Sequence, residues 1–300
     1  GKPLIISAHG QFDPWALGRR RGRKWVTDRL WVKRNLAAAS ALHAVSLLEA
    51  HHTRAAVPGA TIAPIPIGVD PAWFEPAPPA EPLIRQHPEL SGKKLLVFCG
   101  VFEPRKGLMP LVEAWARVAS EHPDWQLVLA GLQKDDYRQQ VDRRLRELGA
   151  AERTSVLGQI DEASKHALFA AGSLFVLPSF SEAFGIVVIE ALASGCPVLT
   201  TRATPWRELE RVGCGWWIET GAPALTAGLR AALGRSDAEL AEMGRRGQAW
   251  AKQRLTWDVA AGQMRQLYDW ALGEAAAPDW LYPPERPLPA LEGSGVKSGE

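Results

Sequence analysis

Two glutamates, Glu182 and Glu190, bracket a turn in a pattern that can bind an extended ligand. The turn follows a short apolar run, Leu174–Leu177, and precedes Phe184–Ser194, whose apolar residues recur at helical spacing. Six residues of helix up to Glu190 rise roughly 9 Å, so the two carboxylates would reach different parts of one ligand. The spacing is equally compatible with a helix-capping Glu182 and a half-exposed Glu190.

A second β-branched run, Val198–Thr201, completes a strand, loop, helix, strand unit. Ligands of such units bind outside the carboxyl ends of the strands, so the loop 178–183 is predicted to face a ligand. The helix start points N–H groups at the same place, which favours an anionic group. The expected donors are the backbone amides of Phe184, Gly185 and Ile186.

A second loop, Gly100–Gly107, carries the cations Arg105 and Lys106 after a strand expected at Leu95–Cys99. No Asp-x-Asp pair follows a predicted strand, and the three cysteines have no metal-binding spacing, so we expect no metal and no cofactor. An anionic leaving group would then be stabilised by protein charge. A lysine ahead of a helix is otherwise commonly a solvated residue.

Composition is that of an ordinary globular protein, with 300 residues, 46% hydrophobic and 23% charged. No apolar run approaches the ~18 residues of a transmembrane helix, and three widely spaced cysteines favour buried, reduced thiols. We therefore expect a cytoplasmic protein. The chain opens directly on a strand-like run, and we expect it to be a fragment of a longer protein.

The charge is uneven, because residues 1–60 hold ten Lys or Arg and three Asp or Glu, a net +7, against +2 for the whole chain. Within residues 15–36, basic residues are interleaved with tryptophans, and a helix is expected from Thr27 or Asp28 through Ala39. This mixture favours peripheral contact with an anionic membrane, at the inner membrane face. An ordinary solvated basic face fits equally well, and no motif supports nucleic acid.

Alternating apolar and amphipathic segments predict an α/β fold with a doubly wound parallel sheet. The boundaries that we expect are a partial Rossmann-like domain at 1–70, a Pro-rich linker at 71–93, a Rossmann-like domain at 94–255, a helix at 256–274 and a disordered tail at 275–300. In the first domain, strands are expected at Ala44–Leu47 and Thr61–Ile67 around a helix at Leu48–Ala56.

The run SEAFGIVVIEALASGCPVLTT resembles the signature of two glutamates with seven residues between them that marks retaining GT-B glycosyltransferases of family 4. The segments KPLIISAHGQFDPWAL, PIGVD, EPRKG, LVLAG, TPWREL and GCGWW are similar to those of bacterial members that build lipopolysaccharide and exopolysaccharide. The resemblance covers residues 2–270 in order. It implies GT-B architecture, with the first part of the N-terminal domain absent from this sequence.

The resemblance also assigns roles to individual residues. It places His9 and Glu182 beside the donor sugar, Lys106 on the diphosphate and Glu190 on the ribose hydroxyls. Without it, His9 is simply a turn histidine. The remaining nucleotide-binding residues that it implies are Gly100, Arg105, Gly131, Gln159, Ile160, Phe184, Gly185 and Ile186.

Two positions depart from the family pattern. Val101 stands where the family has an arginine that contacts phosphate, and Ser173 stands where it often has aspartate. Arg105 could substitute for the missing arginine, although its backbone position differs.

The resemblance implies an enzyme that moves a hexose from a UDP- or GDP-type nucleotide sugar to a glycan or lipid-linked glycan acceptor, with retention and without metal. Two alternatives stay open: a non-catalytic nucleotide-sugar-binding fragment, and a sugar-nucleotide epimerase of the same fold.

Overall fold

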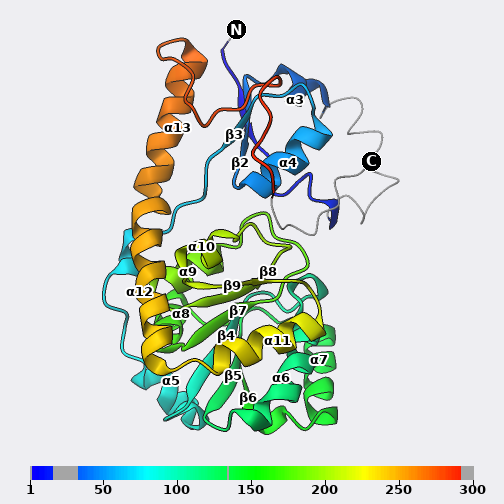
Figure 1. The fold of residues 1–300 in the computed structure, drawn as a ribbon, viewed down its shortest axis with the longest axis vertical. Coiled ribbons are helices and arrows are strands. Elements are labelled where there is room, and N and C mark those ends of the chain that lie inside the picture. The colour runs from blue at the N-terminus through cyan, green and yellow to red at the C-terminus, as the bar shows by residue number, and fades with distance from the viewer. Residues whose placement is uncertain (1, 16–32, 134, 292–300) are drawn as a thin grey trace. The chain divides into compact units, whose positions relative to one another are not determined.

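A computed structural model describes residues 2–15, 33–133 and 135–291. The described chain forms two compact units (Figure 1). The first unit contains the residues up to Gly68, the short segment Ser181–Phe184 and the residues from Leu255 onward. The second unit contains Val69–Phe180 and Gly185–Arg254.

The second unit is built on a six-stranded sheet in the order β6-β5-β4-β7-β8-β9, and every pair of neighbours is parallel. The strands are β4 (Lys94–Cys99), β5 (Trp125–Ala130), β6 (Thr154–Gly158), β7 (Leu174–Leu177), β8 (Val198–Thr201) and β9 (Gly215–Ile218). All residues of β5, β7 and β8 are buried, as continuous apolar runs predict for a sheet covered on both faces. The expected α/β, doubly wound parallel sheet is confirmed.

Helices cover both faces of this sheet. They are α5 (Glu81–Gln86), α6 (Leu108–Val118), α7 (Asp135–Glu147), α8 (Glu162–Ala171), α9 (Ile186–Ala193), α10 (Glu208–Val212), α11 (Ala222–Leu233) and α12 (Asp237–Arg254). Helices α6, α7 and α11 share one hydrophobic core with Leu96 and Phe98 of β4. Helices α8 and α12 pack on α9. The short helix α10 was not predicted from the sequence.

The first unit has a smaller parallel sheet in the order β1-β2-β3, formed by β1 (Ile5–Ser7), β2 (Ala41–Ala44) and β3 (Ile62–Pro64). Its helices are α3 (Lys33–Ala38), α4 (Leu47–Ala56) and α13 (Trp257–Leu272). The expected helix start at Thr27 or Asp28 lies outside the described residues. The strand expected at Ala44–Leu47 is three residues too late, because Ser46 caps α4 and accepts a hydrogen bond from the Glu49 amide.

Residues 71–93 are not a free linker. Pro71–Phe74 form a 3₁₀ helix and Pro88–Leu90 another, and the segment belongs to the second unit. Trp73 is 4% exposed, and its ring lies against His166 and Phe169 of α8. Burial of this tryptophan fixes a segment that its proline content alone suggested to be loose.

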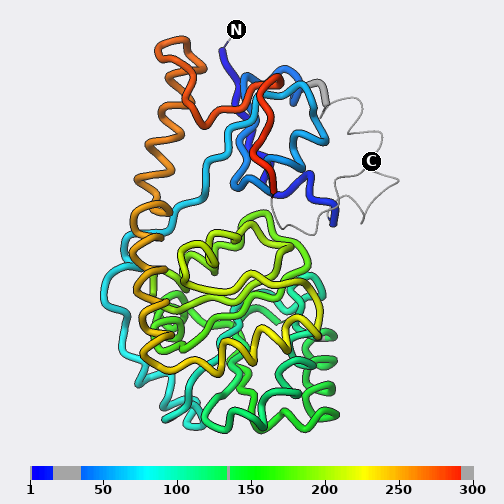
Figure 2. The backbone as a smooth tube through the Cα atoms, in the orientation of Figure 1, coloured from blue at the N-terminus to red at the C-terminus, as the bar shows by residue number. Residues whose placement is uncertain are grey.

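The C-terminal segment also differs from the expectation, because residues 275–291 are packed against the first unit rather than disordered. Tyr282 exchanges two backbone hydrogen bonds with Ile62 of β3, at 2.8 and 2.9 Å. Arg54 donates to the carbonyls of Tyr282, Pro283 and Pro284. Figure 2 shows this segment, in red, returning beside the first sheet.

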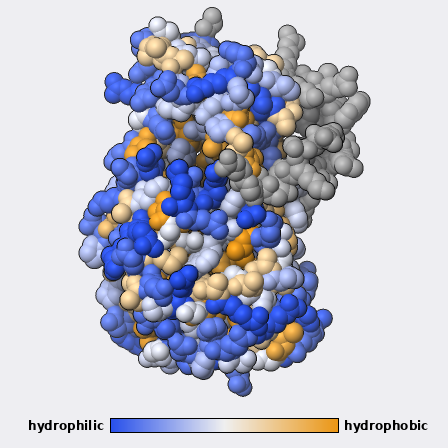
Figure 3. Space-filling view, in the orientation of Figure 1, coloured by the Kyte–Doolittle hydropathy of each residue, from blue (hydrophilic) through white to orange (hydrophobic). Residues whose placement is uncertain are grey.

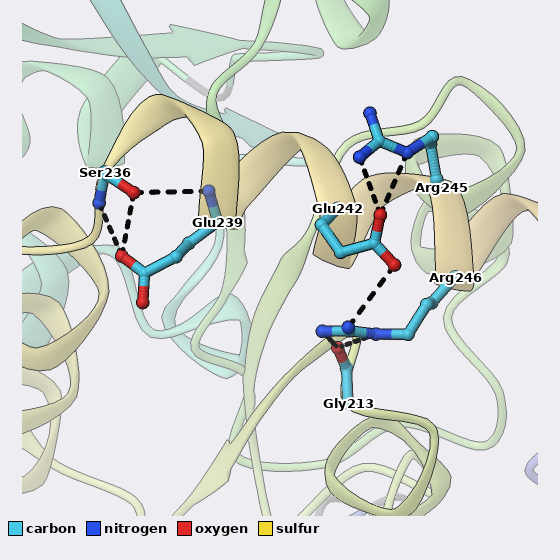
Figure 4. A network of polar contacts seen from close by, with 6 residues as sticks. All are labelled: Gly213, Ser236, Glu239, Glu242, Arg245 and Arg246. Atoms are coloured by element: carbon cyan, nitrogen blue, oxygen red, sulfur yellow. Dashed lines mark hydrogen bonds and ion pairs between the residues drawn. The ribbon is translucent and has the colours of Figure 1, made fainter.

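Helix α12 is fixed at both its start and its middle (Figure 4). Ser236 and Glu239 form a capping box, in which the Ser236 amide and hydroxyl each donate to Glu239 Oε2 at 2.9 Å. Arg246 donates to the Gly213 carbonyl from Nε and Nη2. Gln248 donates to the carbonyl of Ala193, the last residue of α9, at 2.7 Å. These bonds connect α12 to the end of α9, which precedes β8 in the chain, and to the end of α10, which follows it.

Hydrophilic side chains predominate on the face shown in Figure 3, and apolar side chains appear there only in small separate patches.

The three cysteines are free and buried, as expected. Burial raises the pKa of Cys99 to about 11 and that of Cys214 to about 12. No described helix combines the length and the apolar character needed to cross a membrane.

We predict that Leu281→Ala lowers the unfolding free energy of the first unit by about 2–5 kcal/mol, the usual cost of truncating a buried leucine. Leu281 is 2% exposed. Leu272→Ala is the control, because Leu272 is 58% exposed and its loss should change stability by less than about 0.5 kcal/mol. Equal denaturant midpoints for the two variants would show that the C-terminal segment is not packed.

Candidate functional site

The strand order of the second unit changes direction between β4 and β7. From β4 the chain adds β5 and then β6 on one side, and afterwards β7, β8 and β9 on the other. The loops after β4 and β7 therefore leave the same edge of the sheet and diverge, which is where open parallel sheets bind ligands. These are the loops that the sequence singled out, 100–107 and 178–183.

The two loops are held together by their backbones. The Phe180 amide donates to the Arg105 carbonyl at 2.8 Å. Gly107 has φ +70°, and a Cβ placed on it would lie 2.0 Å from the Pro178 carbonyl oxygen. Only glycine allows this approach. On the other side, the buried Thr201 hydroxyl of β8 donates to the Ser179 carbonyl.

The carboxyl ends of β4, β5 and β6 also meet. The Gly100 amide donates to the Ala130 carbonyl at 3.0 Å, and the Gly131 amide donates to the Gly158 carbonyl at 2.7 Å. A Cβ on Gly131 would lie 2.0 Å from the Gly100 carbonyl oxygen, so the packing of these loops already requires glycine here. Gln159 and Ile160 follow directly and are exposed and half-buried, respectively.

Helix α9 begins at Ile186, two residues later than expected, because Gly185 adopts φ +84° and serves as the N-cap. A glycine N-cap has no side chain that could accept from the first turn. The Val188 amide donates to the Gly185 carbonyl at 2.9 Å. The amides of Ile186 and Val187 precede the first i to i−4 bond of the helix and are directed outward from the start of α9. Of the three expected donors, Gly185 and Ile186 lie at this end, and Phe184 precedes the cap.

Glu190 lies deeper in α9 and is only 7% exposed. Its Oε1 accepts a hydrogen bond from Lys165 Nζ at 2.7 Å, whereas its Oε2 is buried and has no hydrogen-bond partner among the described residues. Burial raises the pKa of the Glu190 carboxyl, and Lys165 opposes that shift. The half-exposed alternative for Glu190 is wrong, and the carboxylate offers an oxygen that the protein does not satisfy.

Arg105 is already paired, since its guanidinium lies 3.1 Å from Glu103 Oε1. This contact works against the substitution of Arg105 for the arginine that Val101 replaces. Lys106 is half-buried in the same loop and ends a 3₁₀ turn, Pro104–Lys106. Lys106 therefore lies in the loop after β4, and the positive charge of Arg105 is partly neutralised by Glu103.

His9 lies in the first unit, exposed and with φ +45°, which is uncommon for a residue other than glycine. A buried glutamate, Glu49, holds the loop behind it. The Glu49 carboxylate accepts hydrogen bonds from the backbone amides of Gly10 and of Val45, the latter at 2.6 Å. The loop after β1 is thus tied to the end of β2 by one carboxylate.

His43 of β2 supports the same loop. Its Nδ1 lies 2.9 Å from the Ser7 hydroxyl and its Nε2 lies 2.8 Å from the Ile65 carbonyl oxygen. Because a carbonyl can only accept, Nε2 carries a proton, and Nδ1 of the neutral ring accepts from Ser7. Burial lowers the pKa of His43. The neutral ring lies edge-on to His9, with the ring centroids 6.2 Å apart.

Glu182 is buried in the segment Ser181–Phe184, which contacts the His9 loop within the first unit. Ser181 donates to Asp13 at 2.7 Å, and Ser46 donates to the Ala183 carbonyl at 2.8 Å. The structure thus brings the segments of His9 and Glu182 together. The other predicted site residues belong to the second unit, except Phe184, which is grouped with Glu182.

Sequence reasoning missed Lys165, Trp73 and Glu49, because each acts on a partner that no local motif connects to it. Gln133, after β5, was also missed; its Nε2 is buried and has no hydrogen-bond partner in the part of the chain that the structure describes, and its Oε1 accepts from Arg138 at 2.7 Å. Only the apolar surroundings of Glu190 gave a usable signal, since a buried carboxylate implies a partner.

The motifs TPW and GCGWW, which the sequence left unexplained, shape the loop after β8. The Trp217 indole donates to the Thr204 carbonyl at 3.0 Å, and a Cβ on Gly215 would lie 2.1 Å from the Val198 carbonyl oxygen. Trp206 is buried and meets Trp250 edge-on. These contacts hold the loop that follows Thr201, the last residue of β8.

Within the described residues, no group of three or more His, Cys, Asp or Glu is placed to hold a metal ion.

A family model described as "Glycosyl transferases group 1" matches residues 80–250, more than half of the chain. The chain belongs to this family of glycosyl transferases. A phosphatidyl-myo-inositol mannosyltransferase of Mycobacterium leprae is 32% identical over 191 residues, which are 63% of this chain and 49% of that protein. The chain thus spans about half the length of this curated relative.

Two solved structures have the same GT-B fold. The sucrose-phosphate synthase of Thermosynechococcus elongatus superposes with a TM-score of 0.74 at 23% identity, covering 90% of this chain and 68% of that one. HepE of Anabaena, solved in complex with UDP and glucose, superposes with a TM-score of 0.75 at 22% identity and covers 90% and 72%. The expected glycosyltransferase resemblance and GT-B fold are confirmed.

We predict that Gly107→Ala destabilises the second unit by about 1–3 kcal/mol more than Gly92→Ala, because only the first places a methyl group against backbone. Gly92 is a matched control, with φ +68° and open space where its Cβ would lie. The measurement is urea denaturation of both variants. Equal losses would mean that left-handed backbone strain alone matters and that the two loops are not in contact.

We also predict that Glu49→Ala destabilises the first unit by about 2 kcal/mol or more, since each abandoned amide costs about 1–3 kcal/mol. Hydrogen exchange at the Gly10 and Val45 amides should accelerate. Glu81→Ala is the control, because Glu81 is an exposed acid in the first turn of α5. Unchanged exchange at Gly10 would contradict the role of Glu49.

Proposed function

We propose that the protein is a retaining hexosyltransferase that uses a nucleotide-diphosphate sugar and acts without a metal ion. The observation that carries the proposal is the buried Glu190, whose Oε2 has no hydrogen-bond partner in the described part of the chain, on a helix whose N-cap is a glycine. A ribose hydroxyl suits that oxygen, and a diphosphate suits that helix end.

The remaining assignments place the donor along the loops of the second unit. Lys106 contacts the diphosphate, and Gln159 and Ile160 meet the base. Gly100, Gly131 and Gly158 keep the loop backbones close. The diphosphate carries negative charge that increases as it leaves, so amides and an ammonium aimed at it stabilise the transition state more than the ground state.

The reaction breaks the bond between the sugar C1 and the diphosphate oxygen and forms a bond from C1 to an acceptor hydroxyl oxygen. The hydroxyl proton passes to the departing diphosphate oxygen, and the sugar passes through an oxocarbenium-like state that His9 and Glu182 flank. Retention follows if the acceptor attacks from the face that the diphosphate leaves, which is the course that the family resemblance implies.

The acceptor that we propose is a glycan or lipid-linked glycan of cell-surface polysaccharide synthesis. A mycobacterial relative named for phosphatidyl-myo-inositol supports a lipid-linked acceptor, and the HepE structure with UDP supports a UDP-type donor. Peripheral contact with the inner membrane face through residues 15–36 is part of the same proposal, although residues 16–32 lie outside the described chain.

The second candidate is a non-catalytic nucleotide-sugar-binding protein. The pairing of Arg105 with Glu103 favours it, because Val101 already removes one cation from the phosphate loop. The loss of a charge-assisted phosphate contact costs ~1.5–3 kcal/mol, so transfer could be slowed while binding persists.

We predict that Lys106→Ala reduces kcat for transfer about ten- to hundredfold, and that Glu182→Ala abolishes it. The assay incubates UDP- and GDP-sugars with membrane lipid extract and measures glycolipid product, with and without EDTA. The control is Lys93→Ala, because Lys93 is an exposed lysine on the same unit whose contact is the Pro123 carbonyl.

Wild-type rates in both variants would refute the residue assignments, and loss of activity in EDTA would refute metal independence. Tight nucleotide binding by the wild-type protein without transfer or donor hydrolysis would favour the binding protein instead. Isomerisation of the donor sugar would point to the epimerase.

A further inference from the structure

Lys165 reaches Glu190 from a neighbouring helix. Lys165 belongs to α8 and Glu190 to α9, and the Nζ to Oε1 distance is 2.7 Å. Both side chains are largely removed from water, at 22% and 9% exposure. A carboxylate in such surroundings takes up a proton unless a cation compensates for its lost hydration.

An aromatic ring holds the lysine in place. The Lys165 ammonium lies 5.0 Å from the centroid of the buried Trp73 ring, within cation–π range. The ring of Trp73 also lies 4.8 Å from that of His166, the next residue on α8. Burial lowers the pKa of His166, which therefore adds no positive charge near neutral pH.

The other charged or titratable groups near Glu190 do not replace Lys165. Glu162 of α8 is an acid and raises the pKa of Glu190 further. Cys99, at the end of β4, has a pKa raised to about 11 and stays neutral. Lys165 is thus the cation that acts on Glu190 among the described residues.

We propose that Lys165 is a positioning residue that keeps Glu190 ionised, so that its Oε2 can accept a hydrogen bond from a ribose hydroxyl of the bound nucleotide. This inference rests on the proposed function. The ionised carboxylate offers acceptors only, and the Lys165 ammonium occupies Oε1 and leaves Oε2 available. Protonation would place a hydrogen on the group and remove its negative charge, which weakens the bond to a hydroxyl.

A linkage argument gives the pH dependence. Removal of Lys165 leaves the burial of Glu190 uncompensated, so the pKa of its carboxyl rises. Below that raised pKa, the binding-competent ionised form declines about tenfold per pH unit. Nucleotide affinity of a lysine-free variant should therefore fall more steeply on acidification than the affinity of the wild-type protein.

The experiment measures nucleotide affinity by calorimetry at pH 8 and pH 6. UDP-glucose, GDP-mannose and ADP-glucose are titrated into the wild-type protein, and the tightest binder is used for the variants. A nucleotide sugar is chosen because its diphosphate diester does not titrate between these two pH values. The same nucleotide with 2′-deoxyribose reports the hydroxyl contact.

We predict that Lys165→Met increases the ratio of Kd at pH 6 to Kd at pH 8 about tenfold over wild type. Lys165→Arg should restore the wild-type ratio. Wild type should bind the 2′-deoxy analogue about tenfold more weakly than the ribonucleotide, and Lys165→Met should lose most of that discrimination at pH 6.

Lys94→Met is a matched control. Lys94 also pairs with an acid at 2.7 Å, Asp237, and its ammonium lies 5.9 Å from the Trp125 ring centroid. However, Lys94 is the first residue of β4, at the end of the strand opposite the loop 100–107. It should leave both Kd values unchanged. Melting temperatures of all variants, followed by circular dichroism, establish that they are folded.

The outcomes separate the inference from the proposed function. If wild type binds none of the three nucleotides, both fail. If wild type binds and Lys165→Met keeps the wild-type pH ratio, or loses affinity equally at both pH values and for both sugars, the proposed function stands and the positioning role is overturned.

Discussion

The reversal of strand order beside β4 is the constraint on which the rest of the second unit depends. A parallel sheet that grows first to one side and then to the other must let two loops diverge at its carboxyl edge. Here these are the loops after β4 and β7, and the bond from the Phe180 amide to the Arg105 carbonyl joins them. Gly107 lacks the Cβ that would collide with the Pro178 carbonyl and separate the loops. The Thr201 hydroxyl of β8 holds the loop after β7 by donating to the Ser179 carbonyl.

Two buried glutamates show how the surroundings decide what a carboxylate does. Glu49 is satisfied within the protein, because both of its oxygens accept backbone amides and none is left for a ligand. Glu190 has one oxygen bonded to Lys165 and one that no described residue contacts by a hydrogen bond. The first arrangement is that of a structural residue, which fixes the loop behind His9. The second is typical of a binding residue, since an unsatisfied buried acceptor is costly until something donates to it.

The sequence predicted what depends on local pattern. The strands Leu174–Leu177 and Val198–Thr201 have the expected bounds, because continuous apolar runs determine buried parallel strands. It could not predict pairings between distant segments. Tyr282 pairs with Ile62 across more than 200 residues, so a Pro-rich tail was expected to be disordered. Lys165 is unremarkable in sequence, and only the packing of α8 on α9 brings it to a carboxylate.

The most direct test of this account is a crystal structure with a bound nucleoside diphosphate. We predict that the diphosphate lies on the first-turn amides of α9 beside Lys106, and that a ribose hydroxyl donates to Glu190 Oε2, with no cation coordinating the phosphates. A diphosphate bound away from the loops after β4 and β7, or one bridged to the protein by a metal ion, would contradict the account.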